Sequence, residues 1–266
     1  MNEPASLPPA DVHADFDRDA LRERFLAKRG YWAPWHEDLL ALQPRFLSAY
    51  LELTSLPWTH GVLEPKLKEF IYIAIDAATT HLYQRGLRLH IASALQYGAT
   101  RDEIMEVLQL TSQLGWHTCS VGVPMLAEEL RRRGEGAALD APLDEAARQV
   151  KERFEADLGW WDECCEALVR IAPRFLQAYH AYAATAWKSG VLEPKVKEFI
   201  ALAVSASTTH LHEPAMRLHI RRSLAAGASS AEVMEVLQLT SVLGIHTCSI
   251  GVPIFSDELK RTGHGS

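Results

Sequence analysis

The chain lacks the signatures of several large protein classes. Acidic residues (34 Asp and Glu) outnumber basic ones (27 Lys and Arg), which gives a formal charge of -7, and the sequence contains no basic stripe. We therefore do not expect a nucleic-acid-binding protein. No stretch approaches about 18 consecutive apolar residues, and no basic region precedes an apolar run at the N-terminus, so neither a membrane span nor a secretory signal is predicted. No strand-like alternation of polar and apolar residues occurs, which favours an all-α fold.

Cysteine is also scarce. The chain has four cysteines, and two of them, Cys164 and Cys165, are adjacent in sequence. Such a set does not form a disulfide framework, so the composition indicates a reduced, cytoplasmic protein.

The chain does contain a long internal repeat. Residues 61–130, which begin GVLEPKLKEF and include GWHTCSVGVP, recur 129 positions later as residues 190–259, with about 43 of 70 positions identical and no insertion. Weaker similarity extends the repeat back to about residue 21. The sequence therefore predicts two similar modules. The expected divisions are an N-terminal arm (1–20), module 1 (21–130), a linker with a helical end (131–149), module 2 (150–259) and a tail (260–266).

Periodic apolar residues and capping signals predict the helices of each module. In module 1 we expect an amphipathic helix over 38–56 that is broken at Pro44, and a central helix over 66–80 that starts after Pro65. A capping box at Thr100 should begin another helix, with Glu103 as its second member. A last helix is expected from near Pro124 to residue 132. Glu106 and its mate Glu235 are assigned to a solvated face.

The order KEFIxIA, RLHIxxAL, EIMEVLQL and a Gly-rich turn resembles the carboxymuconolactone decarboxylase family, whose fold is shared with alkylhydroperoxidase-like proteins. The resemblance covers most of 64–130 and again most of 193–259. It implies an all-α tandem of alkylhydroperoxidase-like modules packed with pseudo-two-fold symmetry, sites at contacts between modules, and a homo-oligomer such as a trimer of two-module chains. It leaves the reaction open, because one fold hosts several chemistries.

The peroxidase branch of this superfamily needs a Cys-x-x-Cys motif before the helical histidine. The positions that would hold the two thiols are Tyr83 and Gly86 in module 1, and His212 and Ala215 in module 2. No dithiol can form at these positions, so thiol peroxidase activity is rejected. The decarboxylase branch also lacks the thiols and keeps an LRLH-type segment.

Three pairs of histidines are repeated, which makes them the leading candidates for catalysis. They are His81 with His210, His90 with His219, and His117 with His246. Imidazole titrates near neutral pH and can act as a general acid or base, although a histidine on an apolar helix face can equally be a core residue bonded to a carbonyl. The other six, which have no mate, are expected to face solvent: His13, His36, His60, His180, His212 and His264.

Charged and polar residues beside these histidines complete the candidate site. Glu69 and Glu198 directly precede apolar runs, so each is either an exposed partner of a nearby lysine or a carboxylate that orients an imidazole. Candidates for substrate binding form two repeat-related pairs: Arg88 with Arg217, and Tyr83 with His212.

Three functions remain open from the sequence. The first is a cofactor-independent lyase, decarboxylase or isomerase that acts by histidine acid–base chemistry on a small carboxylated or lactone metabolite, as in aromatic catabolism. The second is an enzyme with Zn²⁺ or another divalent metal bound by His81, His90 and His117, and by His210, His219 and His246. The third is a non-catalytic binding or assembly protein.

Overall fold

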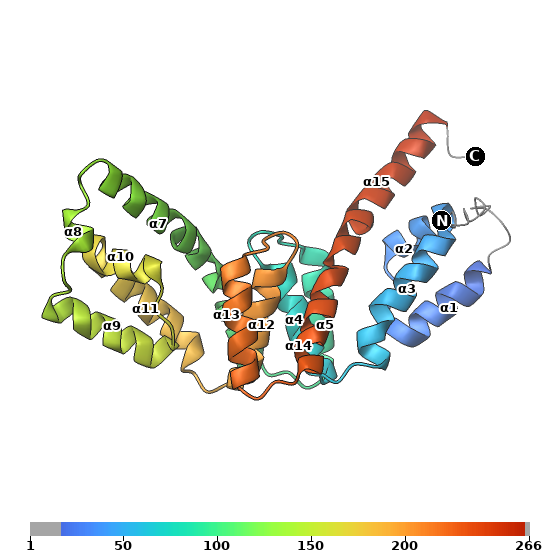
Figure 1. Cartoon of the computed structure of the whole chain (residues 1–266). Coiled ribbons are helices and arrows are strands. Elements are labelled where there is room, and N and C mark those ends of the chain that lie inside the picture. Colours follow the sequence, from blue (N-terminus) through green and yellow to red (C-terminus); the bar gives the residue numbers. More distant parts are fainter. Residues whose placement is uncertain (1–16, 264–266) are drawn as a thin grey trace, which may run out of the picture. The chain divides into compact units, whose positions relative to one another are not determined.

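The computed structural model describes residues 17–263, and these contain fifteen α-helices, two short 3₁₀ segments and no strand. The first half comprises α1 (Arg18–Arg29), α2 (Pro34–Leu42), α3 (Pro44–Thr59), α4 (Pro65–Ala77), α5 (Gln84–Gln96), α6 (Arg101–Ser112) and α7 (Trp116–Arg132). The second comprises α8 (Ala137–Asp140), α9 (Glu145–Leu158), α10 (Glu163–Ile171), α11 (Pro173–Trp187), α12 (Pro194–Ala206), α13 (Glu213–Ala225), α14 (Ser230–Ser241) and α15 (His246–Thr262). The all-α prediction is confirmed (Figure 1).

The helices repeat as the sequence does. Starting residues of α4 and α12, and of α5 and α13, are 129 positions apart, and the same holds for α6 and α14. Each repeat also has a 3₁₀ turn before its last helix, at Gln113–Gly115 and Val242–Ile245. The tandem helical arrangement expected from the repeat is therefore present.

Proline and capping residues set several helix boundaries as expected. Pro44 is the first residue of α3, and Gln43 before it has a non-helical φ of -147°, so the break at Pro44 is confirmed. Pro65 likewise opens α4. The capping box is present, because Thr100 Oγ1 accepts a 3.1 Å hydrogen bond from the Glu103 amide while Glu103 Oε2 accepts one of 2.7 Å from the Thr100 amide.

The last helix of the first repeat differs from the prediction. It begins at Trp116, not near Pro124, and Pro124 lies inside it. A proline in a helix removes one N–H donor, yet α7 continues through Pro124 and packs along α10 (Figure 1). His117 therefore lies in the first turn of this helix.

Contacts divide the chain into two compact units that do not coincide with the repeats. Among the described residues, unit 1 consists of 17–62 and 241–263, and unit 2 of 63–240. The module boundaries drawn from the repeat remain a prediction. Residues 1–16 of the expected arm lie outside the described residues, whereas Arg18, Asp19 and Ala20 belong to α1.

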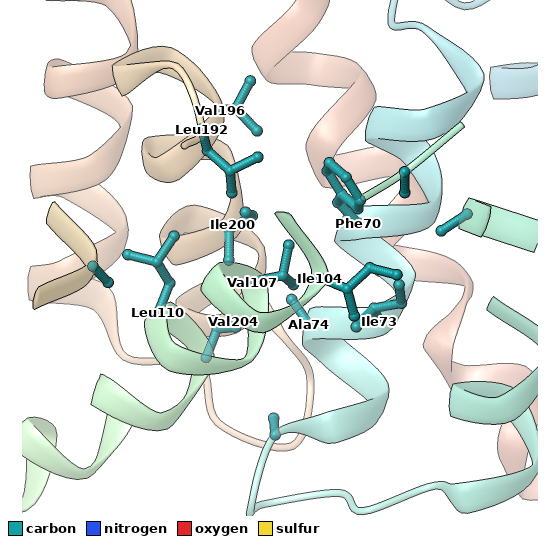
Figure 2. Packing of buried hydrophobic residues seen from close by; sticks show 14 of the residues in the cluster. Phe70, Ile73, Ala74, Ile104, Val107, Leu110, Leu192, Val196, Ile200 and Val204 are labelled. Carbon is teal, nitrogen blue, oxygen red and sulfur yellow. The ribbon is translucent and has the colours of Figure 1, made fainter. Parts of the chain in front are cut away.

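The main core of unit 2 lies where helices of both repeats meet. Phe70, Ile73 and Ala74 of α4 pack with Val107 of α6, and Ile200 of α12 joins them (Figure 2). These side chains are nearly inaccessible to solvent. Burial of apolar surface therefore holds together the parts of both repeats that lie in unit 2.

Two buried ion pairs link the repeats within unit 2. Lys68 Nζ is 3.0 Å from Glu235 Oε1, and Lys197 Nζ is 2.9 Å from Glu106 Oε1. All four side chains are buried, so the solvated face assigned to Glu106 and Glu235 is wrong. Packing of α6 against α12 encloses the charges of Glu106 and Lys197.

A contact between repeat mates reveals the symmetry axis. Thr80 Oγ1 and Thr209 Oγ1 are 3.3 Å apart, and the two residues occupy equivalent positions 129 residues apart. A residue that touches its own mate must lie next to the two-fold axis that relates the copies. The pseudo-two-fold expected for the repeats therefore passes between Thr80 and Thr209.

Unit 1 is a separate helical cluster in which α15 packs on α2 and α1 packs on α3. Its core includes Phe25 and Leu47, and the ring of His36 is fully buried 4.3 Å from that of Phe25. The exposure expected for His36 is therefore wrong. Burial and the nearby Arg29 lower the pKa of His36 to about 3, so its ring is neutral.

The predicted linker is mostly ordered helix. Residues up to Arg132 belong to α7, α8 follows, and α9 begins at Glu145, where Asp144 caps it. Elsewhere, the stretch Ser230–Thr262 is long and apolar enough to cross a membrane by length and composition alone. That is weak evidence, because a core helix of a soluble protein passes the same test.

Candidate active site

The second repeat places an imidazole–carboxylate pair inside unit 2. His219 on α13 has its Nδ1 2.8 Å from Oε2 of Glu198 on α12. The other carboxylate oxygen, Oε1, accepts a 2.6 Å hydrogen bond from Nε of Arg222. Arg222 is three residues after His219 and therefore lies on the same side of α13. Glu198 is 3% exposed, and the guanidinium balances its buried charge.

These bonds decide which nitrogen of His219 can react. A carboxylate bonded to arginine only accepts hydrogen bonds, so Nδ1 of His219 carries the proton shared with Glu198. Nε2 is then the nitrogen that can accept or deliver a proton. An imidazole oriented by a carboxylate is a common arrangement for general acid–base catalysis.

Three further imidazoles gather beside this pair. His117 comes from the first turn of α7, while His210 and His212 lie in the loop between α12 and α13. Nδ1 of His117 is 2.5 Å from Nε2 of His210, and the rings of His117 and His212 stack with centroids 3.9 Å apart and planes 5° apart. A helix of the first repeat thus contributes to the site of the second.

The loop that carries His210 and His212 is held in an unusual backbone conformation. Leu211 between them has a φ of 49°, and its mate Leu82 has a φ of 52°. A left-handed conformation costs energy for a leucine, and such residues cluster at functional sites. The His212 amide donates a 2.9 Å bond to the Ser205 carbonyl, and the Ala215 amide donates a 3.3 Å bond to Nδ1 of His212. Nδ1 of His212 is therefore unprotonated and Nε2 carries the hydrogen, 3.3 Å from Ser120 Oγ.

Burial keeps this imidazole cluster uncharged. Desolvation, followed by the nearby His212, His210 and His219, lowers the pKa of His117 to about 3. Desolvation also lowers the pKa values of His210 and His212. Three neutral imidazoles can each offer one N–H donor without the repulsion that three cations would create.

The low pKa of His117 predicts loss of stability in acid. Between about pH 6.5 and 3 the unfolded chain binds a proton at His117 that the folded chain does not. The free energy of unfolding should therefore decrease as the pH is lowered through this window. Replacing His117 with Asn should flatten this fall. Urea unfolding at pH 7 and pH 5 measures the effect, and replacement of the exposed His60 with Asn is the matched control. An unchanged pH dependence in His117→Asn would contradict the assignment.

A pocket of about 280 Å³ opens beside the pair. Aromatic and aliphatic side chains form its walls, and its polar groups include His117, His212 and His219. This volume suits a small metabolite. The aromatic residues are Trp116, Trp160, Trp161, Tyr179 and Trp187.

The first repeat holds a related pair within unit 2. Nδ1 of His90 is 2.7 Å from Oε2 of Glu69, which is 4% exposed. The exposed pairing with a lysine considered for Glu69 is therefore wrong. On the other side of the ring, His90 Nε2 lies 4.0 Å from Oδ2 of Asp76. Burial, with a smaller contribution from Glu69, raises the pKa of Asp76 to about 8.

The remaining candidate histidines, His81 and His246, lie in different units. His81 lies beside Tyr83, with ring centroids 5.8 Å apart, and desolvation lowers the pKa of His81. His246 is the first residue of α15 and belongs to unit 1. Metal sets made of histidines from one repeat do not match the arrangement in unit 2, because His117 joins His210 and His212 of the other repeat.

The two arginines expected to hold a substrate do not line the pocket. Arg88 and Arg217 are exposed, and Arg217 pairs with Glu213 one helical turn away. Arg221 lines the pocket instead, and Arg222 bonds Glu198. Both were overlooked because their mates in the first repeat are Ala92 and Ser93, so they are not repeated. Helical spacing from His219 was the signal that could have identified Arg222.

Comparison with known proteins agrees with this fold. The carboxymuconolactone decarboxylase family matches residues 44–116 and 173–244, and the chain belongs to that family. It is similar to a crystal structure from Burkholderia xenovorans LB400, provisionally described as a gamma-carboxymuconolactone decarboxylase subunit. The identity is 41%, the TM-score is 0.88, and the match covers 92% of this chain and 98% of the other. No functionally curated protein matches the chain.

Proposed function

We propose that this protein is a decarboxylase-type lyase that acts without a cofactor on a small carboxylated or lactone metabolite. The observation that carries the proposal is the His219–Glu198–Arg222 arrangement at the wall of the pocket. Membership of the carboxymuconolactone decarboxylase family supports a decarboxylase-like enzyme. In this proposal His219 moves the proton and Glu198 orients its ring.

The chemistry requires an acid and a set of hydrogen-bond donors. Loss of CO2 from a β,γ-unsaturated acid whose double bond is conjugated to a carbonyl, as in a lactone, breaks the bond between carbon and carboxylate and leaves the electron pair as a dienolate. Protonated His219 delivers its Nε2 proton to carbon. The neutral imidazole that remains keeps its proton on Nδ1, which stays hydrogen-bonded to Glu198. The imidazole then takes a proton from water. Neutral His212 and the guanidinium of Arg221 are candidates to hold substrate oxygens.

The geometry of the imidazole cluster supports a metal-free mechanism over the divalent-metal alternative. A metal bound by histidine lies in the plane of the ring, and the parallel, stacked rings of His117 and His212 cannot share one ion in this arrangement. The 2.5 Å separation between His117 Nδ1 and His210 Nε2 is shorter than an ordinary hydrogen bond and leaves no room for an ion bound by both nitrogens. Two nitrogens at about 2.0–2.1 Å from a tetrahedral zinc ion would be about 3.3 Å apart.

An assay of CO2 release tests the proposed function. Full-length protein is incubated with a panel of carboxylated butenolides and β,γ-unsaturated acids, and CO2 is measured together with substrate loss. We expect one CO2 per substrate consumed, no change on treatment with a chelator, and no stoichiometric metal by elemental analysis. Ring opening without CO2 would contradict decarboxylation, loss of activity on chelation would favour the metal alternative, and no turnover would favour a binding protein.

We also propose that the chain forms a homo-oligomer. The similar protein from Burkholderia xenovorans is described as a subunit. Val121 and Met125 of α7 are exposed apolar residues one turn apart, and their mates Ile250 and Ile254 of α15 are exposed as well. Such apolar stripes on both repeats are typical of surfaces that another subunit covers.

A further inference from the structure

The two repeats differ around their imidazole–carboxylate pairs although the pairs themselves are the same. At three positions the first repeat has a residue of different size or charge from its mate in the second. These differences are Tyr72 against Ala201, Asp76 against Ser205, and Ser93 against Arg222. All six lie in unit 2.

The first difference decides whether space remains beside the ring. Tyr72 is 5% exposed and stacks on His90, with ring centroids 4.5 Å apart and planes 27° apart. Its mate Ala201 lines the pocket, and the aromatic ring that runs parallel to His219 is Trp187, at 6.2 Å. The phenol ring in the first repeat thus occupies a position that the second repeat leaves open.

The second difference acts on the reactive nitrogen. Asp76 lies 4.0 Å from Nε2 of His90, and its carboxylate is packed so closely on Gly86 that an added Cβ would lie 2.1 Å from Oδ2. In the second repeat Ser205 turns back to donate a 2.8 Å hydrogen bond to the Ala201 carbonyl. The mate of Gly86 is Ala215, which lines the pocket. The serine in place of Asp76 therefore leaves room for the methyl group of Ala215 in place of Gly86.

The third difference stabilises the open site. Arg222 bonds Oε1 of Glu198 and donates a 2.6 Å bond to the Leu158 carbonyl, with its guanidinium 5.1 Å from the centre of the Trp187 ring. Ser93 in the first repeat has neither the reach nor the charge for these contacts. The guanidinium therefore holds both the carboxylate and one wall of the pocket in place only in the second repeat.

We infer that the two sites are not equivalent: small planar carboxylates bind at the second-repeat pair, while Tyr72 and Asp76 close the corresponding position of the first. Trp160, Trp161 and Tyr179 provide flat apolar walls for the ring of the ligand. Arg221 provides positive charge at the pocket wall. The acidic lining residue Asp162 caps α10, where its Oδ1 accepts a hydrogen bond from the Cys165 amide. The preference for a carboxylate rests on the proposed function, whereas the difference between the sites does not.

Binding of benzoate to the full chain tests this inference without any turnover. Isothermal titration calorimetry should find one site per chain. Ala201→Tyr should weaken binding at least tenfold, because the new phenol enters the pocket, and Tyr72→Ala should leave the affinity within twofold. Thermal unfolding checks that each variant is folded, and Ala201→Leu replaces Ala201→Tyr if the tyrosine prevents folding.

Two sites per chain, no saturable binding, or equal effects of the Ala201 and Tyr72 substitutions would each overturn the inference. These outcomes are distinguishable from failure of the proposed function, because benzoate offers no β,γ-unsaturated carboxylate to lose. A chain that binds one benzoate but releases no CO2 from any substrate would keep the inference and reject the decarboxylase.

Discussion

Replacing His219 with Ala is expected to lower kcat/KM by about 10²–10⁴-fold, the range typical for loss of a general acid or base. His219 is the imidazole whose Nδ1 is held by Glu198, which leaves Nε2 as the group that can transfer a proton beside the pocket. Steady-state measurement of CO2 release gives the change. Substrate affinity should alter less than kcat, because the proton is needed in the transition state and not for binding.

Comparison variants make this result specific. Replacing the exposed His60 with Ala controls for loss of a histidine as such. Replacing His90, the repeat mate of His219, should reduce activity much less, because Tyr72 and Asp76 crowd that ring. An equal loss in the two single variants would indicate two working sites, and full activity in the His90/His219 double variant would remove histidine catalysis altogether.

Replacing Lys197 with Met is expected to lower the free energy of unfolding by about 3–5 kcal/mol, because it leaves a buried carboxylate without its cation. Lys197 Nζ is 2.9 Å from Glu106 Oε1 and donates a 2.6 Å hydrogen bond to the Ala186 carbonyl. Both charged side chains are 3% exposed or less. Urea unfolding followed by circular dichroism measures the loss.

The same helix supplies the control. Lys195 pairs with Glu232 at 2.8 Å, but this pair is partly open to solvent, so Lys195→Met should cost about 1 kcal/mol or less. The double variant Lys197→Met with Glu106→Leu should recover most of the stability, since an apolar pair can replace a buried ionic one. Equal losses of unfolding free energy for Lys195→Met and Lys197→Met would show that burial does not determine how much the Lys197–Glu106 pair contributes to stability.

Local signals predicted most of the helices, and the repeat singled out the histidines and glutamates that form the two imidazole–carboxylate pairs. Pro44 and the capping box at Thr100 act on their own backbone, so their effects are visible in the sequence. His219 and Glu198 were found because both are repeated, in helices that pack together. Their pairing itself remained one of two alternatives until the structure placed them 2.8 Å apart.

Features that depend on packing between distant segments were not predictable in this way. His117 joins the site of the other repeat because α7 packs on α10, and no local pattern specifies that partner. Glu106 looks like a surface residue on its own helix, but α12 covers it. Arg222 has no arginine mate, because the equivalent residue of the first repeat is Ser93, so repetition gives no sign of its role.

The contact between Thr80 and Thr209 has an evolutionary consequence. Two identical subunits encoded by one gene and meeting at such an axis would show every substitution in both sites at once, so neither site could change without the other. Once both copies lie in one polypeptide, a mutation at residue 72 no longer appears at residue 201. Fusion of the repeats thus allows Ala201 to keep the second pocket open while the larger Tyr72 fills the equivalent position of the first repeat.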